Sequence, residues 1–143
     1  MVTIENSTVI NRPPEEVYAF VTDPANEAKW HADVLEAHKT SDGPLGVGST
    51  IQFTFNFMGK KEIDLVVREF DSPRREVVEA TSKGPMAPTF TFTFESVDGG
   101  TRFTRKGDIR INGWMRLMEP MMKGMASKRA DGFLAKLKQL LES

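Results

Sequence analysis

The spacing of apolar residues changes near Gly113, and this change constrains the fold more than any other feature of the sequence. Before Gly113, apolar and polar residues alternate, most clearly over residues 51–57, which is the pattern of strands with one buried face. After it, apolar residues recur at helical spacing as far as residue 141. The sequence therefore predicts strands followed by one long amphipathic helix, which Pro120 should either kink or begin.

The remainder of the chain divides into short elements. Pro14, Glu15 and Glu16 make a favourable first helical turn, because proline is tolerated there and acidic side chains suit the helix dipole. A second short helix is predicted over residues 26–30. Strands are predicted over residues 2–10, 34–39, 51–57, 62–70, 75–82, 89–97 and 101–111. The fold class is therefore α+β, an antiparallel sheet of about seven strands with helices on one face.

Composition limits the chemistry that the chain can perform. Its 143 residues suit a single domain over residues 1–143. With 19 basic and 20 acidic residues, the net charge of −1 argues against a nucleic-acid or membrane-surface binder. The lack of cysteine excludes disulfides, iron–sulfur clusters and thiol catalysis, and two histidines are too few for a multi-histidine metal site. We expect neither a metal nor a cofactor.

The sequence also carries signals about location. No apolar stretch approaches the ~20 residues of a membrane span, and residues 1–10 lack the basic start and apolar run of a secretion signal. We therefore expect a cytoplasmic protein without membrane insertion, either a monomer or a homodimer.

The hairpin at Gly99-Gly100 indicates which side chains of its two strands share a face. With these glycines as a two-residue loop, Phe94 pairs with Arg105 and Phe92 pairs with Gly107. The apolar residues of both strands then lie on one face. The glycine would leave room for the ring opposite it.

An earlier hairpin allows two registers. A two-residue loop places Phe55 beside Asp64, whereas a three-residue loop beginning at Gly59 aligns Phe55 with Leu65 and keeps one face apolar. We choose the second register. The next turn, over residues 71–74, then sets Val67 opposite Val78.

The order of these elements and their motifs resembles the helix-grip fold of the SRPBCC or START-like superfamily. This superfamily includes the major birch pollen allergen and polyketide cyclase/dehydrase-like bacterial proteins. The resemblance rests on INRPPEEVYAFVTD at residues 10–23, Trp30, GVGS at 46–49, FDSPRR at 70–75, DGGTR at 98–102 and LAKLK at 134–138. It implies a curved sheet wrapped around the long C-terminal helix, with an apolar cavity between them.

Residues on the concave face, Trp30 and the methionines of the last helix are the expected ligand contacts, although each of them also suits a plain core position. Methionine adapts to irregular shapes, which suits a permissive pocket. The expected ligand-binding residues are Trp30, Phe53, Phe55, Phe57, Leu65, Val67, Phe90, Phe92, Phe94, Arg105, Met118, Met121, Met122 and Met125.

Arg105 is the one charged residue that these registers place in the middle of the apolar face. A buried guanidinium must be paired, since an unpaired charge in an apolar site is costly. Arg105 would either hold a carboxylate, enolate or phenolate of a ligand, or pair with an acid such as Glu119, or extend to the rim.

Candidates for catalysis are few. His31 could act as a general acid or base near neutral pH, with Asp33 close in sequence, and Tyr18 could offer a hydroxyl group to a ligand. Packing or solvated positions explain all three equally simply.

Three functions remain open. The first is binding of a small hydrophobic molecule, whether aromatic, polyketide-like or lipid-like, in the cavity. The second is a cofactor-free cyclase or dehydratase acting on a polyketide-like substrate, which requires the candidate side chains to converge in the cavity. The third is a protein-interaction domain resembling chaperone activators of the superfamily, which predicts a collapsed cavity and a large apolar patch outside it.

Overall fold

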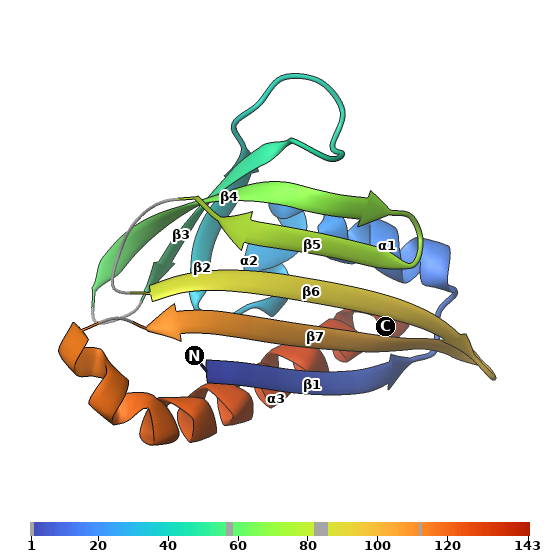
Figure 1. Ribbon diagram of the computed structural model, residues 1–143. Coiled ribbons are helices and arrows are strands. Elements are labelled where there is room, and N and C mark those ends of the chain that lie inside the picture. The colour runs from blue at the N-terminus through green and yellow to red at the C-terminus, as the bar shows by residue number, and fades with distance from the viewer. Residues whose placement is uncertain (1, 57–58, 82–85, 112) are drawn as a thin grey trace.

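A seven-stranded antiparallel sheet curves around one long helix in the computed structural model, which describes residues 2–56, 59–81, 86–111 and 113–143 (Figure 1). The elements are β1 (Val2–Ile10), α1 (Pro14–Thr22), the 3₁₀ helix η1 (Pro24–Asn26), α2 (Glu27–Trp30), β2 (Val34–Lys39), β3 (Thr50–Asn56), β4 (Lys60–Asp71), β5 (Arg75–Ala80), β6 (Met86–Val97), β7 (Gly100–Ile111), the 3₁₀ helix η2 (Gly113–Met118) and α3 (Glu119–Glu142). The predicted α+β helix-grip fold is confirmed.

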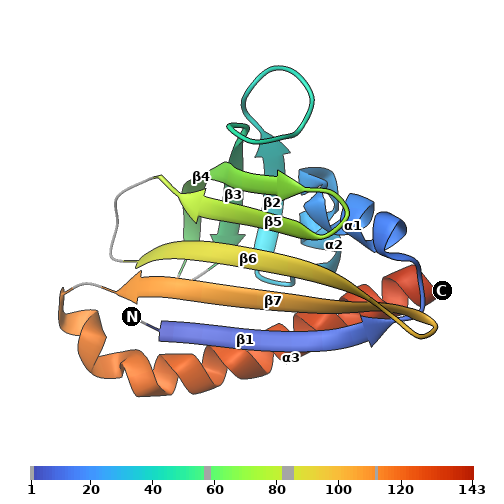
Figure 2. The same cartoon turned by 45° about the vertical axis from the view of Figure 1, so that its right-hand side comes forward.

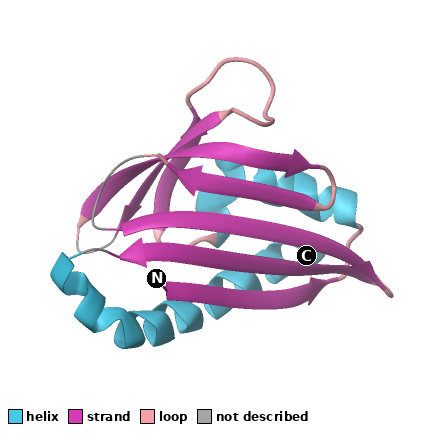
Figure 3. Cartoon of the chain, viewed as in Figure 1, coloured by secondary structure: helices cyan, strands magenta, loops and turns pink. Residues whose placement is uncertain are grey.

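The strands follow the order β1-β7-β6-β5-β4-β3-β2, and every neighbouring pair is antiparallel. In the view of Figure 3, α1, α2 and the C-terminal part of α3 lie behind the sheet, and the N-terminal part of α3 emerges below it; α3 packs along β1. The same arrangement is visible after the rotation to Figure 2. No helix in the described part of the chain is long and apolar enough to cross a membrane.

The long helix begins later than the apolar spacing alone suggests. Residues 113–118 form η2, and α3 starts at Glu119 with Pro120 in its first turn. Backbone N–H groups in the first turn of a helix have no hydrogen-bond partner within the helix, so proline, which has no N–H, costs no hydrogen bond there. Pro120 therefore marks the start of α3 and does not kink it. Further along, α3 buries Ala130, Phe133, Leu134, Leu137 and Leu141, the stripe that the sequence predicts.

The β6–β7 pairing differs from the predicted register by two residues. Phe92 lies opposite Arg105 and Phe90 lies opposite Gly107, because the turn is centred on Asp98 and Gly99. Gly100 belongs to β7, where a Cβ atom would lie 2.1 Å from the Ile10 carbonyl oxygen. That close approach requires glycine in the strand.

The room predicted at Gly107 is used by a different ring. A Cβ atom on Gly107 would come within 3.1 Å of the ring of Phe90, not of Phe92. A ring does pack over Gly107, as expected, but it is the ring of Phe90, because the register is shifted by two residues.

The predicted β3–β4 register is wrong by four residues. Phe53 lies opposite Ile63 and Phe55 lies opposite Lys61. In contrast, Leu65 opposite Ala80 and Val67 opposite Val78 are as predicted, with a bulge between Val67 and Glu69. A shift by an even number of residues keeps every side chain on its face, so the requirement for one apolar face could not reject the wrong register.

Strand β6 begins at Met86, inside the segment predicted as a loop. Proline at position 88 is tolerated because the pairing with β5 stops at Thr89, so that Pro88 pairs with β7 alone among the described strands.

Candidate functional site

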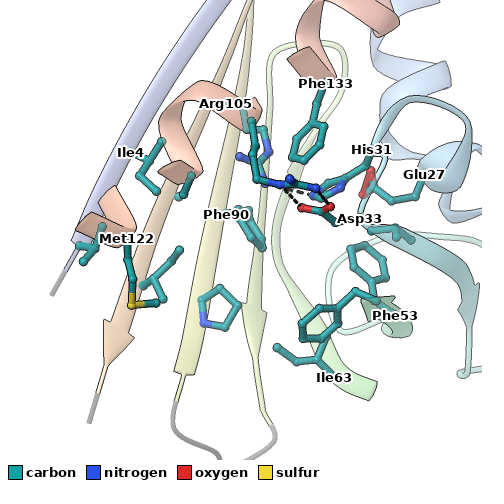
Figure 4. Close-up of a pocket in the computed structure, with 18 of the residues that line it drawn as sticks. Ile4, Glu27, His31, Asp33, Phe53, Ile63, Phe90, Arg105, Met122 and Phe133 are labelled. Carbon is teal, nitrogen blue, oxygen red and sulfur yellow. Dashed lines mark hydrogen bonds and ion pairs between the residues drawn. The ribbon is translucent and has the colours of Figure 1, made fainter. Parts of the chain in front are cut away.

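A cavity of about 480 Å³ lies between the concave face of the sheet and α3 (Figure 4). Its lining is mainly apolar and comes from strands β1 to β4, β6 and β7, from α3, and from α2 with the segment that follows it. The apolar lining residues are Val2, Ile4, Val34, Phe53, Phe55, Ile63, Pro88, Phe90, Phe92, Ile109, Ile111, Met122, Met125, Ala126 and Phe133. The lining also includes Gly107 and six polar residues, Glu27, His31, Asp33, Asn56, Arg105 and Arg129.

The expected ligand-binding residues fall into three groups. Those that line the cavity are Phe53, Phe55, Phe90, Phe92, Arg105, Met122 and Met125. Those that are buried in the protein core and do not line it are Trp30, Leu65, Val67 and Phe94. Met118 and Met121 do not line the cavity either, and Phe57 lies outside the described residues.

Arg105 projects from β7 into the cavity and is 7% exposed. Its guanidinium carbon lies 4.7 Å from the centroid of the Phe90 ring and 5.9 Å from that of Phe133. Contacts of this kind stabilise a cation through the ring quadrupoles. Burial lowers the pKa of Arg105, whereas the charges of Glu27 and Asp33 raise it. The buried Nε atom has no hydrogen-bond partner within the described structure.

His31 stacks on Phe133 with ring centroids 4.0 Å apart, and its Nε2 atom lies 3.4 Å from Nη2 of Arg105. Burial lowers the pKa of His31 to about 3, and the charge of Arg105 contributes to the shift. The imidazole is therefore neutral at pH 7, and Nε2 can accept a hydrogen bond from the guanidinium. The role of His31 as a general acid or base thus stays a prediction, and the lowered pKa means that the ring would enter any reaction at pH 7 in its neutral form.

Glu27 is a site residue that the sequence reasoning missed. It opens α2, is 5% exposed and lines the cavity, and its Oε2 atom is buried with no hydrogen-bond partner in the described chain. Burial raises the pKa of Glu27 to about 8, although the positive charge of Arg105 opposes the shift. Glu27 lies at the start of the four-residue helix α2, and His31 follows the end of that helix. No local sequence pattern marks Glu27 as buried.

A second buried carboxyl group, Glu76 on β5, lies close enough to Glu27 for their charges to interact. It is 2% exposed, and burial together with the charge of Glu27 raises its pKa to about 8. Glu76 shares its face of β5 with Val78, which the register predicts to point inward. The two-residue spacing between Glu76 and Val78 could therefore have predicted that Glu76 points inward.

Asp33 is held by Arg129 of α3. The Nε atom of Arg129 donates to Oδ2 of Asp33 over 2.9 Å, and its Nη2 atom donates to Oδ1. This bidentate pair connects α3 to the segment between α2 and β2 at the cavity. The proposed His31–Asp33 pair is thus divided, because the two side chains bond to different arginines.

Tyr18 lies away from the cavity. Its ring packs edge-on against Phe70 and Phe94, and its hydroxyl donates to the Arg75 carbonyl oxygen over 3.1 Å. Burial raises the pKa of Tyr18. Of the three catalytic candidates, the structure therefore brings His31 and Asp33 to the cavity and leaves Tyr18 in the core.

Within the described residues, no group of three or more His, Asp or Glu side chains could hold a metal ion. The polar groups that line the cavity are thus one guanidinium, one buried carboxyl group, one neutral imidazole, one amide and one ion pair. They belong, in that order, to Arg105, Glu27, His31, Asn56 and the pair Asp33–Arg129.

Comparison with known proteins places this geometry in context. The sequence matches, over residues 1–142, the family described as polyketide cyclase / dehydrase and lipid transport. No curated protein matches the sequence.

Solved structures share the fold at low sequence identity. A START superfamily protein from Mycobacterium smegmatis has a TM-score of 0.84 at 12% identity, covering 99% of this chain and 98% of that one. The di-domain ARO/CYC BexL from the BE-7585A biosynthetic pathway has a TM-score of 0.78 at 16% identity, covering 99% and 50%. The Aha1 dimer from Colwellia psychrerythraea has a TM-score of 0.70 at 23% identity, covering 99% and 97%.

Proposed function

Because the chain belongs to the polyketide cyclase / dehydrase and lipid transport family, in agreement with the START-like resemblance of its sequence, we propose that it binds a small hydrophobic molecule between the sheet and α3. The observation that carries the proposal is the cavity of about 480 Å³, whose lining is mainly apolar. Ligand pockets commonly measure ~300–1,000 Å³ and combine apolar walls with a few polar groups. A cavity of this kind suits a ligand with one polar end.

The helix side of the cavity supports the same proposal. Met122 and Met125 line the cavity from α3, and Met125 is 60% exposed. Flexible thioether side chains at an opening can adjust to ligands of different shape.

A second candidate function, cofactor-free cyclase or dehydratase activity, is favoured by one observation. Glu27 and Arg105 line the same cavity, and the pKa of Glu27 is raised to about 8 by burial. A carboxyl group with a raised pKa can transfer protons near neutral pH, and a neighbouring guanidinium can stabilise an enolate oxygen. Turnover of a β-diketone by the wild-type protein, lost in Glu27→Gln, would support this activity.

The protein-interaction alternative has less support. It expects a collapsed cavity, whereas about 480 Å³ remains between the sheet and α3. The similarity to the Aha1 dimer, at 23% identity, concerns the fold alone.

Filling the cavity from α3 should abolish ligand binding. Ala126 is half-buried and lines the cavity, so in Ala126→Phe the ring would occupy the space of the ligand. We expect the affinity for the neutral dye Nile red, measured by its fluorescence, to fall at least about tenfold.

The matched control is Ala135→Phe, which adds the same ring to an exposed position of the same helix. It should bind Nile red as the wild-type protein does. Equal binding by both variants would contradict a site in this cavity.

A further inference from the structure

We propose that the natural ligand of the cavity is an apolar molecule with a single anionic oxygen group, a carboxylate or an enolate, which Arg105 binds with help from Glu27. This inference rests on the proposed function and specifies the chemical class of its ligand. It follows from the positions and charges of the polar groups at the cavity.

The first step concerns the charge of Arg105. Its guanidinium is buried in an apolar cavity, and the structure gives it no ion pair with a carboxylate among the described residues. Among the described residues its Nε atom has no partner, and the one hydrogen-bond contact seen for its guanidinium, from Nη2 to Nε2 of His31, measures 3.4 Å. Isolated buried cations are costly, so a site that keeps one is suited to receiving an anion.

The second step excludes the neighbouring acids as that anion. Asp33 already accepts two hydrogen bonds from Arg129, so those two charges offset each other. Glu27 and Glu76 are buried, and burial raises the pKa of each to about 8, so both are mostly protonated at pH 7. With His31 neutral, Arg105 has no salt-bridge partner among the described residues, and Asp33, which is bound to Arg129, acts on it through its charge alone.

The third step concerns where these groups lie. Figure 4 shows Arg105, His31, Glu27 and Asp33 gathered at one end of the cavity, whereas Phe53, Ile63, Ile4 and Met122 lie toward the rest of it. The cavity therefore has a polar end and an apolar body. An amphipathic anion with its oxygen group at Arg105 matches that division.

The last step assigns the role of Glu27. A protonated carboxyl group can donate a hydrogen bond to a bound anion, and its Oε2 atom has no other partner in the described chain. The charged and titratable groups near Glu27 are Arg105 from β7, Glu76 from β5 and His31, which follows α2 and lies beside Glu27 in Figure 4. Ionised Glu27 would compete for Arg105 and repel the ligand, so anion binding should weaken above about pH 8.

The test compares an acid with the matching alcohol in competition with Nile red. The two pairs are dodecanoate with dodecanol, and naphthoate with naphthalenemethanol, so that the arms separate an aliphatic body from an aromatic one. We expect at least one anion to bind the wild-type protein about tenfold or more tightly than its alcohol.

Variants then assign the preference to its residues. Arg105→Met, which replaces the guanidinium with an apolar chain, should remove the preference, because it should weaken binding of the anion about tenfold more than binding of the alcohol. Arg102→Met, on the same strand but exposed and paired with Glu95, should keep it. Glu27→Gln, a neutral donor at every pH, should keep the preference and abolish its decline above about pH 8.

Several outcomes would overturn the inference. Equal binding of acid and alcohol by the wild-type protein would do so even where Nile red binding supports the cavity itself. An unchanged preference in a folded Arg105→Met variant would also overturn it. If that variant fails to fold, the acid–alcohol comparison on the wild-type protein and on Arg105→Lys decides. Failure of Nile red to bind at all would instead count against the proposed function.

Discussion

Phe103→Ala should lower the free energy of unfolding by about 3–5 kcal/mol, the largest loss that we expect from a single substitution. Phe103 is fully buried on β7. Its ring meets Trp30 edge-on with centroids 6.3 Å apart and lies 5.1 Å from that of Phe94. Truncation would leave a void surrounded by rigid aromatic side chains, which cannot collapse to fill it. Urea denaturation measures the loss.

The control is Phe55→Ala, which removes the same ring from a half-buried position that lines the cavity. Because Phe55 already borders open space, its removal should cost only about 1 kcal/mol. Similar losses in the two variants would mean that the aromatic residues of the sheet are not divided into a packed core and a cavity wall.

That division is the part of the site that the sequence could not predict. Alternation indicates which face of a strand a residue occupies, and it correctly turned Phe90, Phe94 and Arg105 inward. Alternation does not indicate whether a residue lies at the packed end of the strand or at the end that borders the cavity. Phe94 lies near the end that α1 fills and is core, whereas Phe90 lies toward the open end and lines the cavity.

Pairing register shows the same limit. The strand order and the faces follow from local patterns, but the β3–β4 and β6–β7 registers were wrong by four and two residues. Even shifts keep the apolar face intact, so only turn geometry and close backbone contacts, such as Gly100 against Ile10, select the true register.

The polar groups were predicted unevenly for a related reason. Arg105 stands out because it interrupts an apolar face. Glu27 does not stand out, because the sequence of a short helix with one buried side cannot be distinguished from that of a solvent-exposed helix until the residues packed against it are known. The burial that raises the pKa of Glu27 comes from packing against distant segments, and no local pattern encodes it.

The remaining large effect concerns the dependence of stability on pH. The pKa of Glu76 is about 8 in the folded protein, against an ordinary value of 4.5. Between these values the unfolded chain has released this proton and the folded protein still holds it. Rising pH therefore favours unfolding, by about 1.4 kcal/mol per pH unit for one such group. The contribution of Glu76 to the free energy of unfolding is complete below its ordinary pKa of 4.5 and is lost as the pH rises toward its folded-state pKa of about 8.

Glu76→Gln should remove that loss, because an amide stays neutral throughout. We expect the variant to gain roughly 2–4 kcal/mol over the wild-type protein between about pH 5 and pH 8, measured by urea denaturation at each pH. His31 changes the stability of both proteins equally, since its pKa of about 3 makes acid, below its ordinary value of 6.5, favour unfolding. The control Glu79→Gln alters an exposed acid of the same strand, which pairs with Arg68 at 3.1 Å, and should give a pH profile parallel to that of the wild-type protein. A Glu76→Gln profile that is also parallel would show that Glu76 is ionised in the folded protein, and the charge balance around Glu27 and Arg105 would then have to include a second buried anion.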